Sequence, residues 1–191
     1  MPRSGATLVK VACVAVVACA VLWVSLAVAP GVNGLAGAAL AAISLAIAVV
    51  DYRQMIIPDE LNASALLIGL AAAGLRTPAA PFGSVLEAAV RAAAMFAAFF
   101  AFRLLYRRVR GVEGMGLGDV KLAAAAGAWL DWPQLPLAVD FAALAALAAV
   151  LSARLKGREL AWTAKVAFGV FFAPSIWLCW VLAAWWRDSP V

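Results

Sequence analysis

Seven apolar segments, separated by short polar gaps, are the feature that most constrains how this chain can fold. They cover about residues 8–29, 34–50, 61–75, 85–106, 119–132, 135–155 and 166–186. A bilayer core about 30 Å thick is crossed by about 20 apolar residues in a helix, and a segment in lipid has to satisfy its backbone hydrogen bonds internally. Two segments, 61–75 and 119–132, are short for a full crossing. We therefore expect an all-α, polytopic membrane bundle with about six to seven transmembrane helices.

The composition excludes several other classes of protein. Of the 191 residues, 67% are hydrophobic and 13% are charged, which is more apolar surface than a soluble domain of this size can bury. The net charge of +5 comes from basic residues in the gaps between apolar segments, so we expect the lipid bilayer as a partner and no nucleic acid. There is no histidine, and the three cysteines, Cys13, Cys19 and Cys179, are far apart or form no C-x-x-C. We expect neither a metal nor a cofactor.

The distribution of lysine and arginine predicts the orientation of the chain. With the N-terminus inside, 12 of the 15 basic residues fall at inner ends of segments, and only Arg76, Arg91 and Arg187 fall toward the outside. This asymmetry favours an inside N-terminus and an outside C-terminus. Four tryptophans then lie near outer ends, as interfacial anchors do: Trp129, Trp132, Trp185 and Trp186. We interpret segment 8–29 as a retained anchor and not as a cleaved signal, because Pro30 directly follows Ala27-Val28-Ala29.

Two aspartates stand where apolar segments meet the inner face. Asp51 ends the second segment, and Asp119, 68 positions later, opens the fifth. Each has a structural explanation: Asp119 as the N-cap of its helix, Asp59 as the N-cap of the third helix, and Asp51 as an interfacial charge. In a chain without histidine or a serine triad, two carboxylates at one depth also indicate general acid–base chemistry.

A cluster of glycines precedes Asp119: Gly111, Gly114, Gly116 and Gly118. Glycine permits close backbone approach and unusual dihedral angles. The phosphate-binding pattern G-x-x-x-x-G-K-[ST] is absent, so this is not a phosphate cradle. The turn is either a plain connection between helices or a loop that dips into the bilayer.

Two motifs resemble the signatures of type IV prepilin peptidases, the G-x-G-D intramembrane aspartyl proteases of bacteria. They are Asp51-x6-Pro58-Asp59 and Gly116-Leu117-Gly118-Asp119-Val120-Lys121. The resemblance covers about residues 34–155. It implies that Asp51 and Asp119 are the catalytic pair, and that an active-site loop contains Gly114, Gly116, Gly118 and Lys121. A weaker likeness is Phe168-Gly169, preceded by Ala167 where the family usually has proline.

The resemblance also implies a substrate and a location. We expect one membrane-embedded peptidase domain over 1–191, with an anchor helix in 1–33, a catalytic core in 34–155 and a C-terminal helix in 156–191. It would remove the basic leader from prepilins or pseudopilins at the cytoplasmic face of the bacterial inner membrane. Because no paired C-x-x-C motifs are present, the chain resembles the short, peptidase-only forms of tight-adherence (Flp) pilus systems, and methylation is not expected.

Two other functions stay open at this point. One is a protease of the signal-peptide-peptidase type, which usually has a Tyr-Asp motif, whereas here Tyr52 follows Asp51. The other is a small proton-coupled transporter or a pilus assembly factor. Transporters place their ionisable groups near the bilayer midplane, which differs from the interfacial position expected here.

The remaining charged residues have structural interpretations. Lys121 either tunes the charge of Asp119 or binds the substrate backbone. Arg91 and Asp140 share a depth near the outer face, and Glu87 precedes Arg91 by four residues, so we expect a structural ion pair. A basic cluster before the glycine turn indicates topology and contact with anionic lipid: Arg103, Arg107, Arg108 and Arg110.

Overall fold

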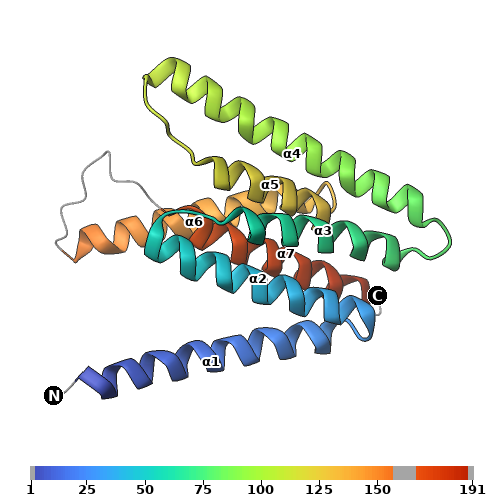
Figure 1. The fold of residues 1–191 in the computed structure, drawn as a ribbon, viewed down its shortest axis with the longest axis horizontal. Helices are drawn as coiled ribbons and strands as arrows, with labels where there is room; N and C mark the ends of the chain where they lie inside the picture. Colours follow the sequence, from blue (N-terminus) through green and yellow to red (C-terminus); the bar gives the residue numbers. More distant parts are fainter. Residues whose placement is uncertain (1–2, 157–166, 189–191) are drawn as a thin grey trace.

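A computed structural model describes residues 3–156 and 167–188, and all regular secondary structure in these ranges is helical. The helices in chain order (Figure 1) are α1 (Arg3–Val28), α2 (Val32–Gln54), α3 (Asp59–Arg76), α4 (Pro81–Arg110), α5 (Leu117–Trp129), α6 (Gln134–Leu155) and α7 (Gly169–Asp188). Each corresponds to one of the seven apolar segments. The expected all-α membrane bundle is confirmed.

The helices differ in their ability to cross a bilayer. Four of them, α2, α4, α6 and α7, are long and apolar enough to do so, and α1 contributes a shorter apolar stretch over Ala15–Val28. Helix α5 has only 13 residues, which is about 20 Å at 1.5 Å per residue and well short of an apolar core about 30 Å thick. The molecule is thus a membrane protein in which α5 lies outside the set of membrane-spanning helices.

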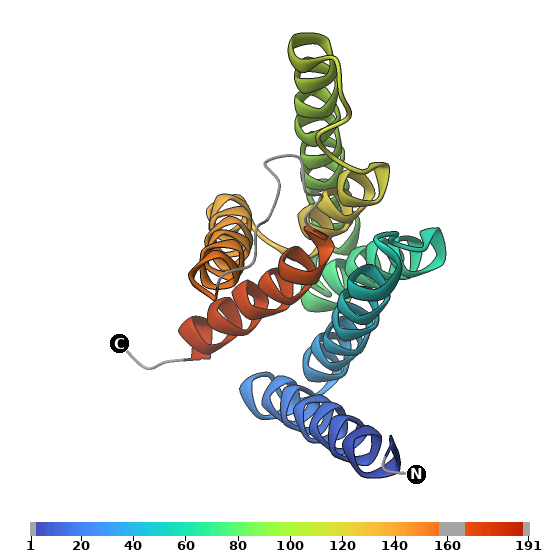
Figure 2. The same ribbon diagram turned by 90° about the vertical axis from the view of Figure 1, so that its left-hand side faces the viewer.

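Helix α5 forms the centre of the bundle. It packs against α3, α4 and α7, while α2 packs against α1, α3 and α7, and α6 packs against α7. Figures 1 and 2 show α1 and α4 at opposite edges of the molecule. The stretch from Leu122 to Trp129 is buried along its whole length. A short helix covered on all sides can be uniformly apolar, and the alanines of α5 fit this position.

Small residues let the central helices approach one another closely. A Cβ placed on Gly127 of α5 would lie 2.5 Å from the backbone of Arg91 in α4, and one on Gly69 of α3 would lie 2.7 Å from Nε1 of Trp129. In lipid, where apolar burial does not drive helices together, such close packing supplies much of the association energy. The register of α5 against α3 and α4 is therefore determined by glycines.

One of the expected interfacial tryptophans lies elsewhere. Trp132, Trp185 and Trp186 are exposed, but Trp129 is only 1% exposed and its Nε1 donates a hydrogen bond of 2.7 Å to the carbonyl of Ala65. The assignment of Trp129 as an interfacial anchor was wrong. Because α5 ends inside the bundle, its last residue meets α3 instead of lipid, and the indole N–H finds its acceptor there.

Candidate active site

Asp51 lies in the last turn of α2 and points at the beginning of α7. The helix runs to Gln54, about one turn beyond the expected segment 34–50, so Asp51 is within the helix and only 4% exposed. Its Oδ2 accepts a hydrogen bond of 3.1 Å from the backbone N–H of Val170. The first N–H groups of a helix have no partner inside it and carry partial positive charge. Asp51 therefore caps a helix that begins 118 residues later in the chain.

The approach of α7 to Asp51 depends on Gly169, the first residue of that helix. A Cβ on Gly169 would lie 2.8 Å from Oδ2 of Asp51 and 2.7 Å from Cδ1 of Ile57. Any side chain here would displace the carboxylate or Ile57. Gly169 and Val170 belong to the site, although the motifs in 34–155 did not include them. The pair Phe168-Gly169, the weaker likeness in the sequence, is the signal that corresponds to this contact.

Asp119 is the third residue of α5 and not its N-cap. The helix begins at Leu117 with Gly116 as the N-cap, and the backbone N–H of Gly116 donates to the carboxylate of Asp119. A side chain at the third position that reaches back to the N-cap is one half of a capping box. The expected N-cap role was wrong by one turn, because the glycine turn ends earlier than the motif suggested.

The charge of Asp51 acts on Asp119. Burial, and after it the negative charge of Asp51, raise the pKa of Asp119 to about 6, against the opposing effect of the Gly116 hydrogen bond. The partial positive charge at the start of α5 is thus not sufficient to keep the half-buried carboxyl of Asp119 fully ionised at neutral pH. Asp51, which the sequence placed at the same depth as Asp119, is close enough for its charge to act on Asp119.

Ile57 holds the two helix starts together. A Cβ on Gly118 would lie 3.0 Å from Cβ of Ile57, and Gly169 packs on the other end of the same side chain. Ile57 is 6% exposed and follows Met55, whose left-handed φ of 55° ends α2. Ile57, in the connection between α2 and α3, therefore lies between the start of α5 and the start of α7. Because Gly118 has no side chain, Asp119 can lie close to Ile57.

Asn62 of α3 fixes the start of α5 from another side. Its Nδ2 donates a hydrogen bond of 3.3 Å to the carbonyl of Gly118, and the residue is 3% exposed. Its Oδ1 is buried without a hydrogen-bond partner among the described residues. Buried polar atoms are normally paired, so an unpaired oxygen next to Gly118 is unusual. The sequence analysis did not identify Asn62, which lies in an otherwise apolar helix.

Lys121 connects the two motifs. Its Nζ lies 2.6 Å from Oδ1 of Asp59, at the surface of the site. Pro58 is the N-cap of α3 and Asp59 is its first residue, so the expected capping role of Asp59 was wrong. One motif supplies the anion and the other the cation, which holds the first turns of α3 and α5 side by side. Both sequence interpretations of Lys121 left out this partner.

The ion pair is expected to contribute little to stability. Lys121 and Asp59 are 40% and 69% exposed, and exposed pairs contribute about 0–1 kcal/mol. A double-mutant cycle of Lys121→Met and Asp59→Asn, measured by unfolding of the purified protein, should give a coupling energy below about 1 kcal/mol. A coupling energy several times larger would show that the pair is effectively shielded from solvent.

The glycine turn is held by Arg103 of α4. Its Nη1 donates a hydrogen bond of 2.6 Å to the carbonyl of Met115, and its Nη2 lies 2.7 Å from Oε1 of Glu113. The sequence interpretation of Arg103, topology and contact with anionic lipid, did not include these partners in the glycine turn. Arg108 and Arg110 are exposed, as lipid-facing residues are. Gly114 packs against the ring of Tyr106.

The chemistry available to this site is that of carboxyl groups. Within residues 3–156 and 167–188, no three His, Cys, Asp or Glu side chains come together as metal ligands. Two buried or half-buried carboxyls share a site, one with a pKa near neutrality, and both lie at the positive end of a helix. Such a pair can hold one proton and exchange it with a reacting group.

Comparisons with known proteins agree with this geometry. Residues 38–151 match the type IV leader peptidase family. The chain is 37% identical over 145 residues to the prepilin leader peptidase/N-methyltransferase of Burkholderia pseudomallei (strain 1026b), an alignment that covers 73% of this chain and 45% of that protein. The proteins of the same name from Pectobacterium carotovorum subsp. carotovorum and Aeromonas hydrophila are 35% and 31% identical. These alignments cover 83% and 87% of this chain and 53% and 54% of the relatives.

The chain spans about half the length of the curated relatives it matches. No solved structure matches it.

Proposed function

Since the chain belongs to the type IV leader peptidase family, we propose that it is a membrane aspartyl endopeptidase that removes the leader peptide from prepilins or pseudopilins. The observation that supports this most is the electrostatic effect of Asp51 on Asp119. The two aspartates come from motifs 68 positions apart, and the charge of one raises the pKa of the other.

In the proposed mechanism the two carboxyls hold one proton between them. The ionised carboxylate takes a proton from a water molecule, which attacks the scissile carbonyl carbon, while the protonated carboxyl donates to the carbonyl oxygen. The tetrahedral intermediate then collapses: one of its hydroxyl groups returns a proton to the carboxylate that donated earlier, the C–N bond breaks, and the proton taken from water passes to the leaving amine. Because the pair titrates as a unit, either aspartate can be the base.

The proposal concerns peptide-bond cleavage alone. The name of the relatives also contains an N-methyltransferase, and the alignments cover about half of those proteins. The proposed catalytic core takes in the beginning of α7 in addition to 34–155, because Gly169 and Val170 touch Asp51. The anchor assigned to 1–33 and the remainder of the C-terminal segment 156–191 act as its membrane support.

We assign the site to the cytoplasmic face of the bacterial inner membrane. The excess of lysine and arginine at one set of helix ends supports this orientation. Arg103 and Arg107 lie at the same end of α4 as the glycine turn, so the site and the basic cluster share one side of the membrane. The proposed partners are prepilins or pseudopilins, whose scissile bond lies between a basic leader and an apolar helix.

The proposed mechanism gives a pH dependence with a definite sign. Below a pH of about 6, the raised pKa of Asp119 keeps a proton on the pair; above it, the proton is lost and no acid remains for the carbonyl oxygen. The value of kcat/KM should therefore fall as pH rises beyond about 6, by about tenfold per unit once the limb is reached. Asp59→Asn should leave this limb in place, whereas a constant kcat/KM from about pH 5.5 to 8 would contradict the assignment.

The function is tested by cleavage with the purified protein. The full chain in detergent is mixed with a prepilin, and mass spectrometry identifies the bond that is cut. The double variant Asp51→Asn with Asp119→Asn, purified in parallel, controls for contaminating proteases. Cleavage between leader and apolar helix supports the proposal. No cleavage would favour the transporter or assembly factor, and cleavage inside the apolar helix would favour a protease of the signal-peptide-peptidase type.

A further inference from the structure

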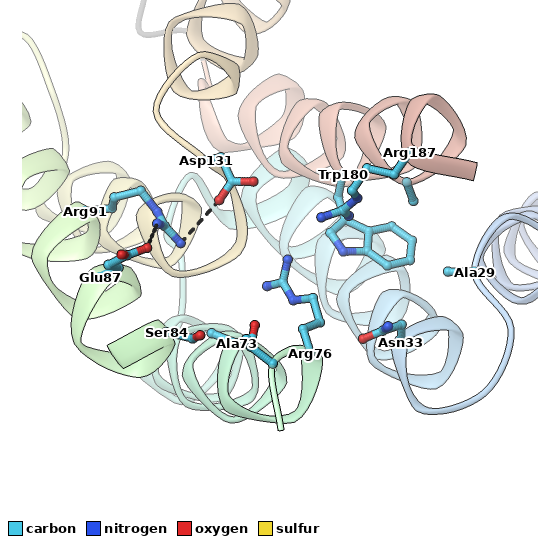
Figure 3. A pocket seen from close by; sticks show the side chains of 12 residues that line it. Ala29, Asn33, Ala73, Arg76, Ser84, Glu87, Arg91, Asp131, Trp180 and Arg187 are labelled. Atoms are coloured by element: carbon cyan, nitrogen blue, oxygen red, sulfur yellow. Dashed lines mark ion pairs between the residues drawn. The ribbon is translucent and has the colours of Figure 1, made fainter. Parts of the chain in front are cut away.

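A second polar site lies at the end of the bundle away from the aspartates. It is a cavity of about 400 Å³ between the end of α3, the beginning of α4 and the end of α7. Its charged lining residues are three arginines, Arg76, Arg91 and Arg187, and two acids, Glu87 and Asp131. These three arginines are the ones that the charge asymmetry assigned to the outer side. Figure 3 shows how their side chains surround the cavity.

Arg91 uses both acidic side chains of the cavity. It is 6% exposed, its Nη1 lies 3.9 Å from Glu87 and its Nη2 lies 3.5 Å from Asp131. Its Nε donates a hydrogen bond of 3.3 Å to the carbonyl of Gly127. The expected structural ion pair with Glu87 is confirmed, and Asp131 takes the place suggested for Asp140. Asp131 also acts on Arg76 through its charge, but two acids against three arginines leave the cavity lining with a net positive charge among the described residues.

Arg76 is the group that these contacts do not explain. Its Nε donates to the carbonyl of Ala72 at 3.3 Å, but its Nη2 is buried and has no hydrogen-bond partner within the described residues. Figure 3 shows its guanidinium pointing into the cavity, toward Trp180 and Asp131. A buried guanidinium nitrogen without an acceptor is unfavourable unless something supplies one. The exposed Arg187 lies on the lining of the same cavity and adds positive charge.

We propose that this cavity binds a phosphate group through Arg76 and Arg187. Nη2 of Arg76 has no acceptor among the described residues and Arg187 adds an exposed guanidinium, and the planar fork of arginine matches the oxygens of a phosphate. The phosphate can belong to a lipid headgroup or be free in solution. The exposed Trp185 and Trp186 at the end of α7 place the cavity at the membrane interface, where basic pockets between helices meet anionic headgroups.

Binding is measured on the purified full chain in a neutral detergent, by intact-protein mass spectrometry and by the midpoint of thermal unfolding. The probes are dioleoylphosphatidylglycerol and inorganic phosphate, with dioleoylphosphatidylcholine as the zwitterionic comparison. We expect Arg76→Gln and Arg187→Gln each to weaken binding of the effective probe by about tenfold or more, as the loss of a charged hydrogen bond does. Arg53→Gln, which changes an exposed arginine in the last turn of α2 at the other end of the bundle, should stay within about twofold of the wild type.

The two probes distinguish the sources of the phosphate. A response to phosphatidylglycerol alone assigns the cavity to a lipid headgroup, and a response to both probes assigns it to the phosphate group itself. A response to neither, or equal binding by the wild type and both cavity variants, would overturn the proposal. If Arg76→Gln fails to fold, the exposed Arg187→Gln decides the outcome alone. None of these measurements depends on peptidase activity.

Discussion

Asp119→Asn is expected to lower the rate of leader cleavage by at least about 10²–10⁴-fold, the usual contribution of a general acid or base. Asparagine keeps the size of the side chain and can accept from the N–H of Gly116, but it has no proton to exchange. Asp51→Asn should have an effect of the same size. The amide can still accept the hydrogen bond from the N–H of Val170, so the change removes the exchangeable proton and leaves this contact in place. Cleavage of a prepilin by membrane-inserted protein is followed on gels under single-turnover conditions.

The two substitutions should not add. If the aspartates share one proton, removing either one disables the pair, and the double variant should be no slower than the slower single variant. Asp59→Asn is the matched control: it removes a nearby carboxylate whose partner is the exposed Lys121, and it should change the rate by no more than a few-fold. Normal processing by a stably inserted Asp51→Asn or Asp119→Asn protein would refute the aspartyl mechanism.

Gly169→Ala is expected to lower kcat/KM by about 10²-fold, although it adds only one methyl group far from both motifs in the sequence. That methyl would lie 2.8 Å from Oδ2 of Asp51, closer than real contacts allow, so the carboxylate or the start of α7 has to move. A displacement of about 1 Å at a reacting group can cost this much in rate. The measurement is the kinetics of leader cleavage together with the thermal unfolding midpoint.

Gly83→Ala provides the comparison for Gly169→Ala. Gly83 lies in the first turn of α4, and a Cβ there meets no atom within 4 Å, so the same change should leave the rate unaffected. Equal kinetics for the two alanine variants would mean that the contact between α7 and Asp51 does not position the carboxylate. A slow Gly169→Ala enzyme with a normal unfolding midpoint would locate the effect in the site.

The helices and the aspartates could be predicted because each depends on local sequence. Segments in lipid have to be apolar and helical, so hydropathy finds them even where the ends are shifted by a turn, as at Asp51. The family motifs then selected Asp51 over Asp59. The helix starts were less predictable. The N-cap of α5 is Gly116, which has no capping side chain, and its backbone N–H donates a hydrogen bond to Asp119.

Contacts between distant parts of the chain could not be predicted. Asn62 reaches a carbonyl 56 residues away, and Trp129 is buried because α5 ends against α3. Arg103 looked like any other basic residue near a membrane surface until its hydrogen bond to Met115 was known. The local sequence offers an ordinary explanation for each of these side chains. Their partners become evident only from the packing of α5 in the centre of the bundle.

The contact between Arg103 and Met115 leaves the end of α4 extending past the point where it holds the glycine turn. Seven residues of α4 continue beyond Arg103 to Arg110, about 10 Å of helix, and the chain then runs back to α5, as Figure 1 shows. In the proposed orientation, the arginines on this extension belong among the lipid headgroups. Every hydrolysed bond consumes one water molecule, so access of water to the carboxyls beside the glycine turn is a further requirement for each turnover.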